Sequence, residues 1–423
     1  MKKLIGTAML AALLATSAFA ELNMGAWLRT LVAPVAYNGD EIQAGWENSW
    51  GYGIRNARIS FNFTSDDEKV GMMYDVFGDG ASGFGSGDYR AMWFQPVDWF
   101  KAMVGHIDNG YAMRGDLCYG SWAWLRPNNW FERDEGLTFN LGNRDGLQLE
   151  FFPVDGLQIL AHLSLPWDGG FAKFSDQIKN SLIGVSYTIG DFATIKVAYL
   201  GGYSDKDKDS AGTWTPTGKP GWHYKKDGKE ASFDNDGKFY EALLNGEIEY
   251  WNPGIWAPFG GAQKTFGNAQ IGFDLKGVEN LWLTVGARVQ LVDKYYKGNE
   301  MAKVAAGASY QITDSFGLSV SAAALLLKEI SPKIQAGVGV NVGLTDVLGL
   351  EADVRWLGDL EASEHCISFC VGLNWAMSSN GSLGIGFQGT TNGNGFAAGD
   401  TALSAAKSDA FCFAVPVRFG LWF

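Results

Sequence analysis

The last thirteen residues of the chain alternate between two kinds of side chain without interruption. The odd positions are all apolar: Phe411, Phe413, Val415, Val417, Phe419, Leu421 and Phe423. The even positions carry Cys412, Ala414, Pro416, Arg418, Gly420 and Trp422. Because successive side chains point to opposite faces of a strand, this segment predicts a β-strand with one continuous apolar face. Such a face has to be buried in a core or in contact with lipid.

The chain also ends on an aromatic residue, with no polar tail after it. Terminal residues of soluble domains usually fray in water. The segment resembles the terminal strand of bacterial outer-membrane β-barrels. That resemblance implies that Phe419, Leu421 and Phe423 belong to the signal read by the barrel assembly machinery.

The other end of the sequence has the organisation of a secretory signal peptide. Lys2 and Lys3 precede an apolar stretch, residues 4–14, and Ala18-Phe19-Ala20 has the A-x-A form of a cleavage site. The apolar stretch is too short to cross a bilayer as a helix, and no later stretch reaches about 18 apolar residues. We therefore expect residues 1–20 to be removed, leaving residues 21–423 as a single domain.

Composition agrees with a barrel and limits the partners. The chain has 56 Gly, 27 Phe, 17 Trp and 15 Tyr, which suits twisted strands, tight turns and aromatic girdles at the two membrane interfaces. Its formal net charge is −13. An acidic chain without basic runs excludes nucleic acid as a reasonable partner. For a pore, the same net charge predicts a weak preference for cations.

Short turns separate alternating segments along the whole mature chain. Five carry Asp, whose side chain bonds back to nearby backbone N–H groups; these lie within 94–100, 152–157, 187–192, 310–316 and 342–347. Three less regular turns lie at 65–68, 276–280 and 378–381. Longer connections alternate with them, at about 37–54, 78–87, 108–145, 166–180, 202–266, 292–302, 328–333, 358–365 and 390–410.

This alternation of short turns and long loops is typical of an outer-membrane barrel, with short periplasmic turns and longer external loops. Eight short turns join sixteen strands, and the first and last strands make eighteen. The sequence therefore predicts an all-β protein, a transmembrane antiparallel β-barrel of about 18 strands, with 16 as the alternative.

Single strands indicate which face meets which solvent. In segments 57–64, 281–291 and 348–356, apolar residues alternate with polar or charged ones. An Arg or Lys turned outward at the bilayer midplane costs roughly 2–4 kcal/mol, so we expect charges to face the lumen and apolar residues to face lipid. A soluble β-sandwich would alternate too, but the regular spacing through the whole mature chain favours the barrel.

Barrels of 16–18 strands leave an aqueous channel, whereas about eight strands are filled by side chains. The architecture resembles that of bacterial porins. The resemblance implies an outer-membrane channel for passive diffusion of small hydrophilic solutes and ions, in contact with lipid, without a cofactor and with homotrimers as the common assembly. Candidate pore-lining residues are Arg58, Lys196, Arg288, Glu351, Asp353, Arg355 and Arg418.

Two long loops carry further candidates. Loop 108–145 resembles the constriction loop of general porins, because opposed acidic and basic groups in a passage create a transverse field. Those groups are Arg114, Asp116, Arg126, Glu132, Arg133, Asp134 and Glu135, with Trp122, Trp124 and Trp130 among them as rings on which sugars could stack. An external loop packed on its own aromatic residues is the equal alternative. Loop 202–266 is long enough to cap the pore or present a surface.

Other functions have less support in the sequence. The four His residues are dispersed and neither a G-x-S-x-G nor an H-E-x-x-H motif occurs, so we expect no enzyme, no catalytic residues and no metal site. The four Cys residues, Cys118, Cys366, Cys370 and Cys412, do not make a disulfide framework. A sugar-selective channel similar to maltoporins, or a surface adhesin or structural barrel with a blocked lumen, remains as an alternative.

Overall fold

The computed structural model describes residues 20–46, 57–79, 83–108, 143–166, 170–205, 222–226, 229–233, 264–292, 300–329, 331–359, 365–391 and 409–423. The predicted signal peptide lies outside the described residues except for Ala20, which begins the first strand.

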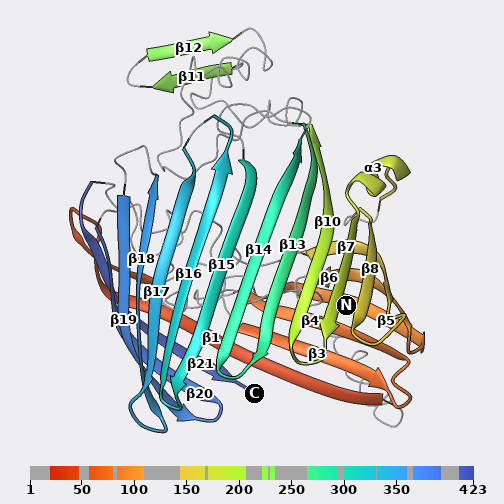
Figure 1. Ribbon diagram of the computed structural model, residues 1–423, viewed down its shortest axis with the longest axis horizontal. Coiled ribbons are helices and arrows are strands. Elements are labelled where there is room, and N and C mark those ends of the chain that lie inside the picture. The colour runs from red at the N-terminus through yellow and green to blue at the C-terminus, as the bar shows by residue number, and fades with distance from the viewer. Residues whose placement is uncertain are drawn as a thin grey trace.

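Strands make up nearly all of the described chain (Figure 1). They are β1 Ala20–Tyr37, β2 Ile42–Trp46, β3 Ala57–Ser65, β4 Val70–Asp79, β5 Gly83–Val97, β6 Phe100–Asp108, β7 Asn143–Phe151, β8 Leu157–Ser164, β9 Leu182–Ile189, β10 Ala193–Asp205, β11 Trp222–Lys226, β12 Lys229–Phe233, β13 Lys264–Val278, β14 Leu281–Val292, β15 Glu300–Thr313, β16 Phe316–Leu327, β17 Lys333–Gly343, β18 Leu348–Asp359, β19 His365–Ser378, β20 Gly381–Thr390 and β21 Cys412–Trp422. One short helix, α3, spans Phe174–Lys179. No helix among the described residues is both long and apolar enough to span a membrane.

All described strands except the β11–β12 hairpin belong to one sheet, and each pairing between them is antiparallel. The sheet closes because β1 pairs with β21, from Trp27 opposite Trp422 to Tyr37 opposite Phe413. The other edge of β1 pairs first with β3 and then with β2. Strands β2 and β3 therefore form two parts of one barrel strand, and the closed barrel has 18 strands, as predicted.

The first predicted connection, 37–54, is wrong in part. The chain turns within Asn38–Glu41 and resumes as β2 at Ile42. Asn38 makes this tight turn, because its side-chain Oδ1 accepts hydrogen bonds from the backbone N–H groups of Asp40 and Glu41, each at 2.9 Å. The sequence signal was a single Asn-Gly pair, which favours a short hairpin turn.

The eight predicted short turns are all present and lie at one end of the barrel, here called the short-turn end. They connect β3–β4, β5–β6, β7–β8, β9–β10, β13–β14, β15–β16, β17–β18 and β19–β20. The opposite end, here the long-loop end, carries the other connections, including α3 and the β11–β12 hairpin, which lies above the barrel in Figure 1.

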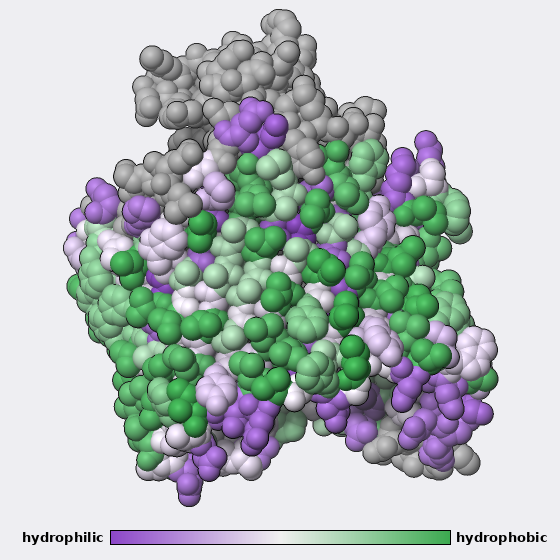
Figure 2. All heavy atoms as spheres, viewed as in Figure 1, coloured by the Kyte–Doolittle hydropathy of each residue, from purple (hydrophilic) through white to green (hydrophobic). Residues whose placement is uncertain are grey.

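The outer face of the barrel is largely apolar (Figure 2), and hydrophilic residues collect towards its two ends. On β14, Val285 and Val289 are 45% and 47% exposed. Between them Arg288 points to the other face, where it contacts Glu300. The predicted arrangement, apolar residues outward and charges inward, holds along these strands.

The wall is not of uniform height. Strands β6, β7, β8 and β9 are only 8 or 9 residues long, and we call them the short wall. Strands β13 to β19 run to between 11 and 15 residues, and we call them the tall wall. Figure 1 shows β7 and β8 ending well below the upper ends of β13–β16.

Candidate functional site

The inner face of the barrel is built from polar side chains that alternate with exposed aliphatic ones. On β18, Asp353 and Arg355 are buried while Val354 between them is exposed. On β10, Lys196 is buried between the exposed Ile195 and Val197. Because charged groups are very rarely this buried without partners, the partners of these residues matter for the wall.

Ion pairs supply those partners, mostly between neighbouring strands. Lys196 Nζ lies 3.0 Å from Asp274 Oδ2, and Arg288 Nη2 lies 2.9 Å from Glu300 Oε1. Arg58 donates a hydrogen bond to Asp75 across β3 and β4. The fourth pair, Arg355 and Asp353, is looser, at 3.9 Å on one strand.

The fifth pair spans several strands. Arg418 on β21 donates a hydrogen bond to Asn374 on β19, and its Nη2 lies 3.6 Å from Glu351 Oε1 on β18. The path crosses β20 at Gly384, where a Cβ atom would lie 2.8 Å from Arg418 Nε. The absence of a side chain at Gly384 therefore lets Arg418 lie flat along the wall instead of projecting into the lumen.

The seven predicted pore-lining residues all lie on this inner face, and each takes part in one of the five ion pairs. The sequence prediction missed Asp75, Asp274 and Glu300, the carboxylate partners of three of them. Asp75 and Asp274 alternate with apolar neighbours in the same way as the predicted residues, so alternation could have found them. The predicted constriction-loop charges and Trp122, Trp124 and Trp130 lie outside the described residues.

The short wall departs from the predicted alternation on both faces. Its inner face, together with that of the adjoining strand β10, carries an apolar cluster of Leu160, Leu182, Ala198 and Leu200, in which Leu160 and Leu182 have no exposed surface. Strand β6 and its neighbour β5 add a second inner cluster of Ala91, Met103 and Ile107. The expectation that apolar residues face outward is therefore wrong for these positions.

Polar groups on the short wall form two separate networks. On the inner face, buried His162 lies 3.2 Å from Gln148 Oε1, and Gln148 donates to Glu150 at 2.6 Å. On the outer face, His106 Nδ1 lies 3.1 Å from Asp145 Oδ2. Register places Arg90 opposite His106 in the same outer row, so this outer row is polar above the apolar row of Met92, Val104 and Leu147.

The described cysteines are not joined in disulfides. Cys366, Cys370 and Cys412 are buried on the inner face near the long-loop end. Cys366 Sγ lies 2.9 Å from Thr390 Oγ1. Within the described part of the chain no three His, Cys, Asp or Glu side chains come close enough to hold a metal ion.

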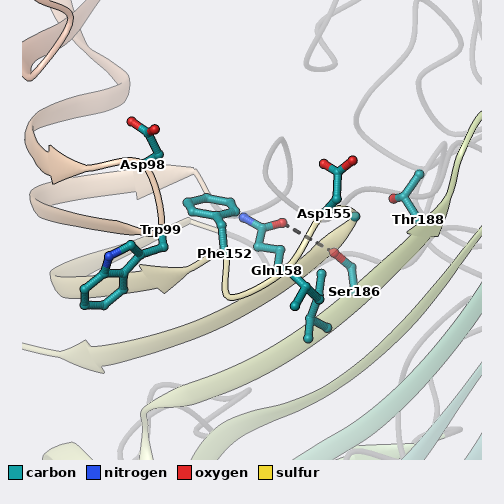
Figure 3. Close-up of a pocket in the computed structure, with 10 residues that line it drawn as sticks. Asp98, Trp99, Phe152, Asp155, Gln158, Ser186 and Thr188 are labelled. Carbon is teal, nitrogen blue, oxygen red and sulfur yellow. Dashed lines mark hydrogen bonds between the residues drawn. The ribbon is translucent and has the colours of Figure 1, made fainter.

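Two hollows open at the short-turn end. The larger, about 470 Å³, lies among the β5–β6 and β7–β8 turns and strand β9 (Figure 3). Its lining includes Asp98, Phe152, Asp155, Gln158, Ser186 and Thr188. The smaller, about 220 Å³, lies on the tall wall and is lined by polar residues that include Gln311, Asn341, Glu351 and Asn374.

The last strand has the geometry that its alternation predicted. Phe419, Leu421 and Phe423 are exposed on the outer face. Cys412 and Ala414 are buried on the inner face. The terminal residue is fixed to β1 by two backbone hydrogen bonds, from Phe423 N to Ala26 O at 2.7 Å and from Ala26 N to Phe423 O at 3.0 Å. The terminus is therefore part of the barrel seam.

Comparison with known proteins identifies the fold alone. No protein-family model matches the chain, and no curated protein matches it significantly. Among solved structures, the anion-selective porin from Comamonas acidovorans is similar with a TM-score of 0.53 at 11% identity, over 96% of this chain and 100% of that one. The channel DcaP of Acinetobacter baumannii gives a TM-score of 0.46 at 10% identity, over 96% and 98%. The 18-stranded closed barrel is thus of the porin type.

Proposed function

We propose that this porin-type barrel is a water-filled channel of the bacterial outer membrane, through which small hydrophilic solutes and ions diffuse passively. The observation that carries the proposal is the charged inner face of an 18-stranded closed barrel, a strand number at which side chains no longer fill the interior. Charged groups on that face require water or polar partners, whereas the aliphatic outer face suits lipid.

The inner wall also supports a preference for anions, the reverse of the weak cation preference that the net charge predicts. Among the wall side chains that the structure describes, basic groups outnumber acidic ones. The basic ones are Arg58, Lys101, Arg144, Lys196, Arg288, Lys303, Lys333, Arg355 and Arg418; the acidic ones are Asp75, Glu150, Asp274, Glu300, Glu351 and Asp353. A pore filters ions by the charges that line it, not by the net charge of the chain. The similar Comamonas protein is described as anion-selective.

Single-channel recording of residues 21–423 in a planar lipid bilayer tests the channel. Discrete conductance steps are the expected result. A folded barrel, shown by a heat-dependent shift in electrophoretic mobility, that stays silent would contradict the proposal and favour the adhesin or structural alternative.

A reversal potential in a KCl gradient tests the selectivity. Lys303 on β15 and Lys333 on β17 lie on the inner face of the tall wall, with β16 between them. Replacing both by Glu should shift the reversal potential from the value of an anion-selective pore to that of a cation-selective pore. Lys69→Glu, at an exposed short turn, is the matched control and should leave it unchanged. A wild-type barrel that prefers cations would refute the anion preference and leave the proposal of a channel unaffected.

The same proposal includes the surroundings of the barrel. The protein would be exported, inserted by the barrel assembly machinery, and held in outer-membrane lipid, as a homotrimer and without enzymatic activity. Light scattering of the detergent-solubilised barrel measures the number of copies. Sugar selectivity through Trp122, Trp124 and Trp130 stays a prediction, to be tested by oligosaccharide block of the channel in Trp→Ala variants.

A further inference from the structure

The larger hollow at the short-turn end combines an aromatic ring with two carboxylates. In Figure 3 the carboxylates of Asp98 and Asp155 stand on the same side of the strands, and the ring of Phe152 lies between them. The ring of Trp99 points the other way. The amide of Gln158 and the hydroxyl of Thr188 complete the polar rim.

Neither carboxylate is neutralised within the described structure. Asp98 and Asp155 make no ion pair and accept no hydrogen bond through their side chains among the residues that the structure describes. The smaller hollow is lined by Glu351, which is paired with Arg418 at 3.6 Å, and by Asp314, and no aromatic residue lines it. Of these two hollows, the larger one therefore places two carboxylates that have no ion pair among the described residues beside an aromatic ring.

Backbone hydrogen bonds hold the larger hollow in shape. Phe152 N donates to Trp99 O at 2.8 Å, which joins the β7–β8 turn to the β5–β6 turn. Thr188 N donates to Gly156 O at 2.8 Å, which joins the same turn to β9. Gly156 has φ +77°, and a Cβ there would lie 2.1 Å from Thr188 O. The close approach of turn and strand thus depends on glycine, and the site needs no large rearrangement to receive a ligand.

We infer that this hollow binds a small organic cation, such as a quaternary ammonium or amine compound, at the short-turn mouth of the barrel. A cation over a phenyl face is attracted by the ring quadrupole, and the flanking carboxylates add charge attraction. Its volume of about 470 Å³ lies within the usual range for small-molecule sites. The inference does not require that the barrel conducts.

Calorimetric titration of the folded barrel in a nonionic detergent tests this site. The probes are choline and its uncharged isostere 3,3-dimethylbutan-1-ol, which separate charge recognition from apolar contact. We expect saturable binding of choline that weakens with added salt, and no saturable binding of the alcohol. Equal binding of the two probes, or no binding of choline, would overturn the inference.

Variants locate the binding. Asp98→Asn combined with Asp155→Asn should weaken choline binding by about two- to thirtyfold, since two exposed charge pairs are lost. Phe152→Leu should weaken it by about threefold, because it keeps an apolar side chain but removes the ring. Asp346→Asn, at an exposed turn of the tall wall, is the matched control and should bind as the parent does. Unchanged binding in the double variant would place the cation elsewhere.

The two proposals fail separately. A barrel that conducts but does not bind choline refutes the site alone. A barrel that binds choline and never conducts refutes the channel alone.

Discussion

The short wall and the tall wall belong to one sheet but differ in height and in the side chains on their inner faces. A 9-residue strand rising about 3.3 Å per residue and tilted about 40° stands about 23 Å high, slightly less than the roughly 25 Å apolar band of an outer-membrane barrel. A 14-residue strand such as β15 reaches about 35 Å on the same arithmetic. The strands of the tall wall are thus long enough to extend beyond such an apolar band, and those of the short wall are not.

Their inner faces differ in the same way. The tall wall places ion pairs such as Arg288–Glu300 inside, together with the buried Leu325 and Leu327 of β16, and valines outside. The short wall places Leu160 and Leu182 inside, with no exposed surface. Alternation along a strand shows which residues share a face, but whether the inner face is polar or apolar depends on the side chains of the neighbouring strands that it contacts.

The largest effect should come from breaking a buried ion pair. Asp274→Asn leaves the ammonium of Lys196 without its carboxylate, and both side chains are less than a tenth exposed. We expect a loss of about 3–5 kcal/mol in the free energy of unfolding, measured by urea titration of Trp fluorescence in lipid vesicles. Adding Lys196→Gln should recover part of the loss; a double variant as unstable as the single one would show that the pair is not the cause.

Apolar packing inside the short wall should matter almost as much. Leu182→Ala removes a side chain with no exposed surface and should cost about 2–4 kcal/mol by the same measurement. Val289→Ala, on the outer face of the tall wall and 47% exposed, should cost about 0.5 kcal/mol. Equal losses at the two positions would remove the distinction between the walls.

A smaller effect should follow from a glycine of the short wall. Gly105 on β6 has φ +132°, and a Cβ there would lie 2.1 Å from Arg90 O. Gly105→Ala should cost about 1–3 kcal/mol in strain. Gly349→Ala on the tall wall meets only an ordinary contact at 3.7 Å, so its unfolding curve should match that of the parent.

The smallest effect concerns the short turn between β3 and β4. The Ser65 hydroxyl donates to the Asp67 carboxylate at 2.7 Å, and this hydrogen bond, with one from the Lys69 backbone, lowers the pKa of Asp67 below its usual 3.8. Ser65→Ala should raise that pKa, seen by NMR titration of the carboxyl carbon. A depressed folded pKa stabilises the turn above the unfolded pKa and ceases to do so as the pH falls through the folded value.

Sequence reasoning recovered the parts of the fold that local chemistry controls. The eight short turns follow from Asp, Asn and Gly, and the strand count follows from the turns. It could not find that Arg418 crosses Gly384 to reach Glu351, because that contact spans four strands, β18 to β21, whose register is set only when the sheet forms. The hollow of Asp98, Phe152 and Asp155 was missed for the same reason: it lies among two turns and a strand that no single segment reveals.

The seam between β1 and β21 ties the two ends of the chain together. The first strand to be synthesised thus waits for the last before both its edges are paired, and pairing over such a sequence separation is entropically costly and slow. Until Phe423 reaches Ala26, the open edges of β1 and β21 present unpaired N–H and C=O groups that other chains could add to. Closure is for this reason a protection against aggregation as much as a way of enclosing a lumen.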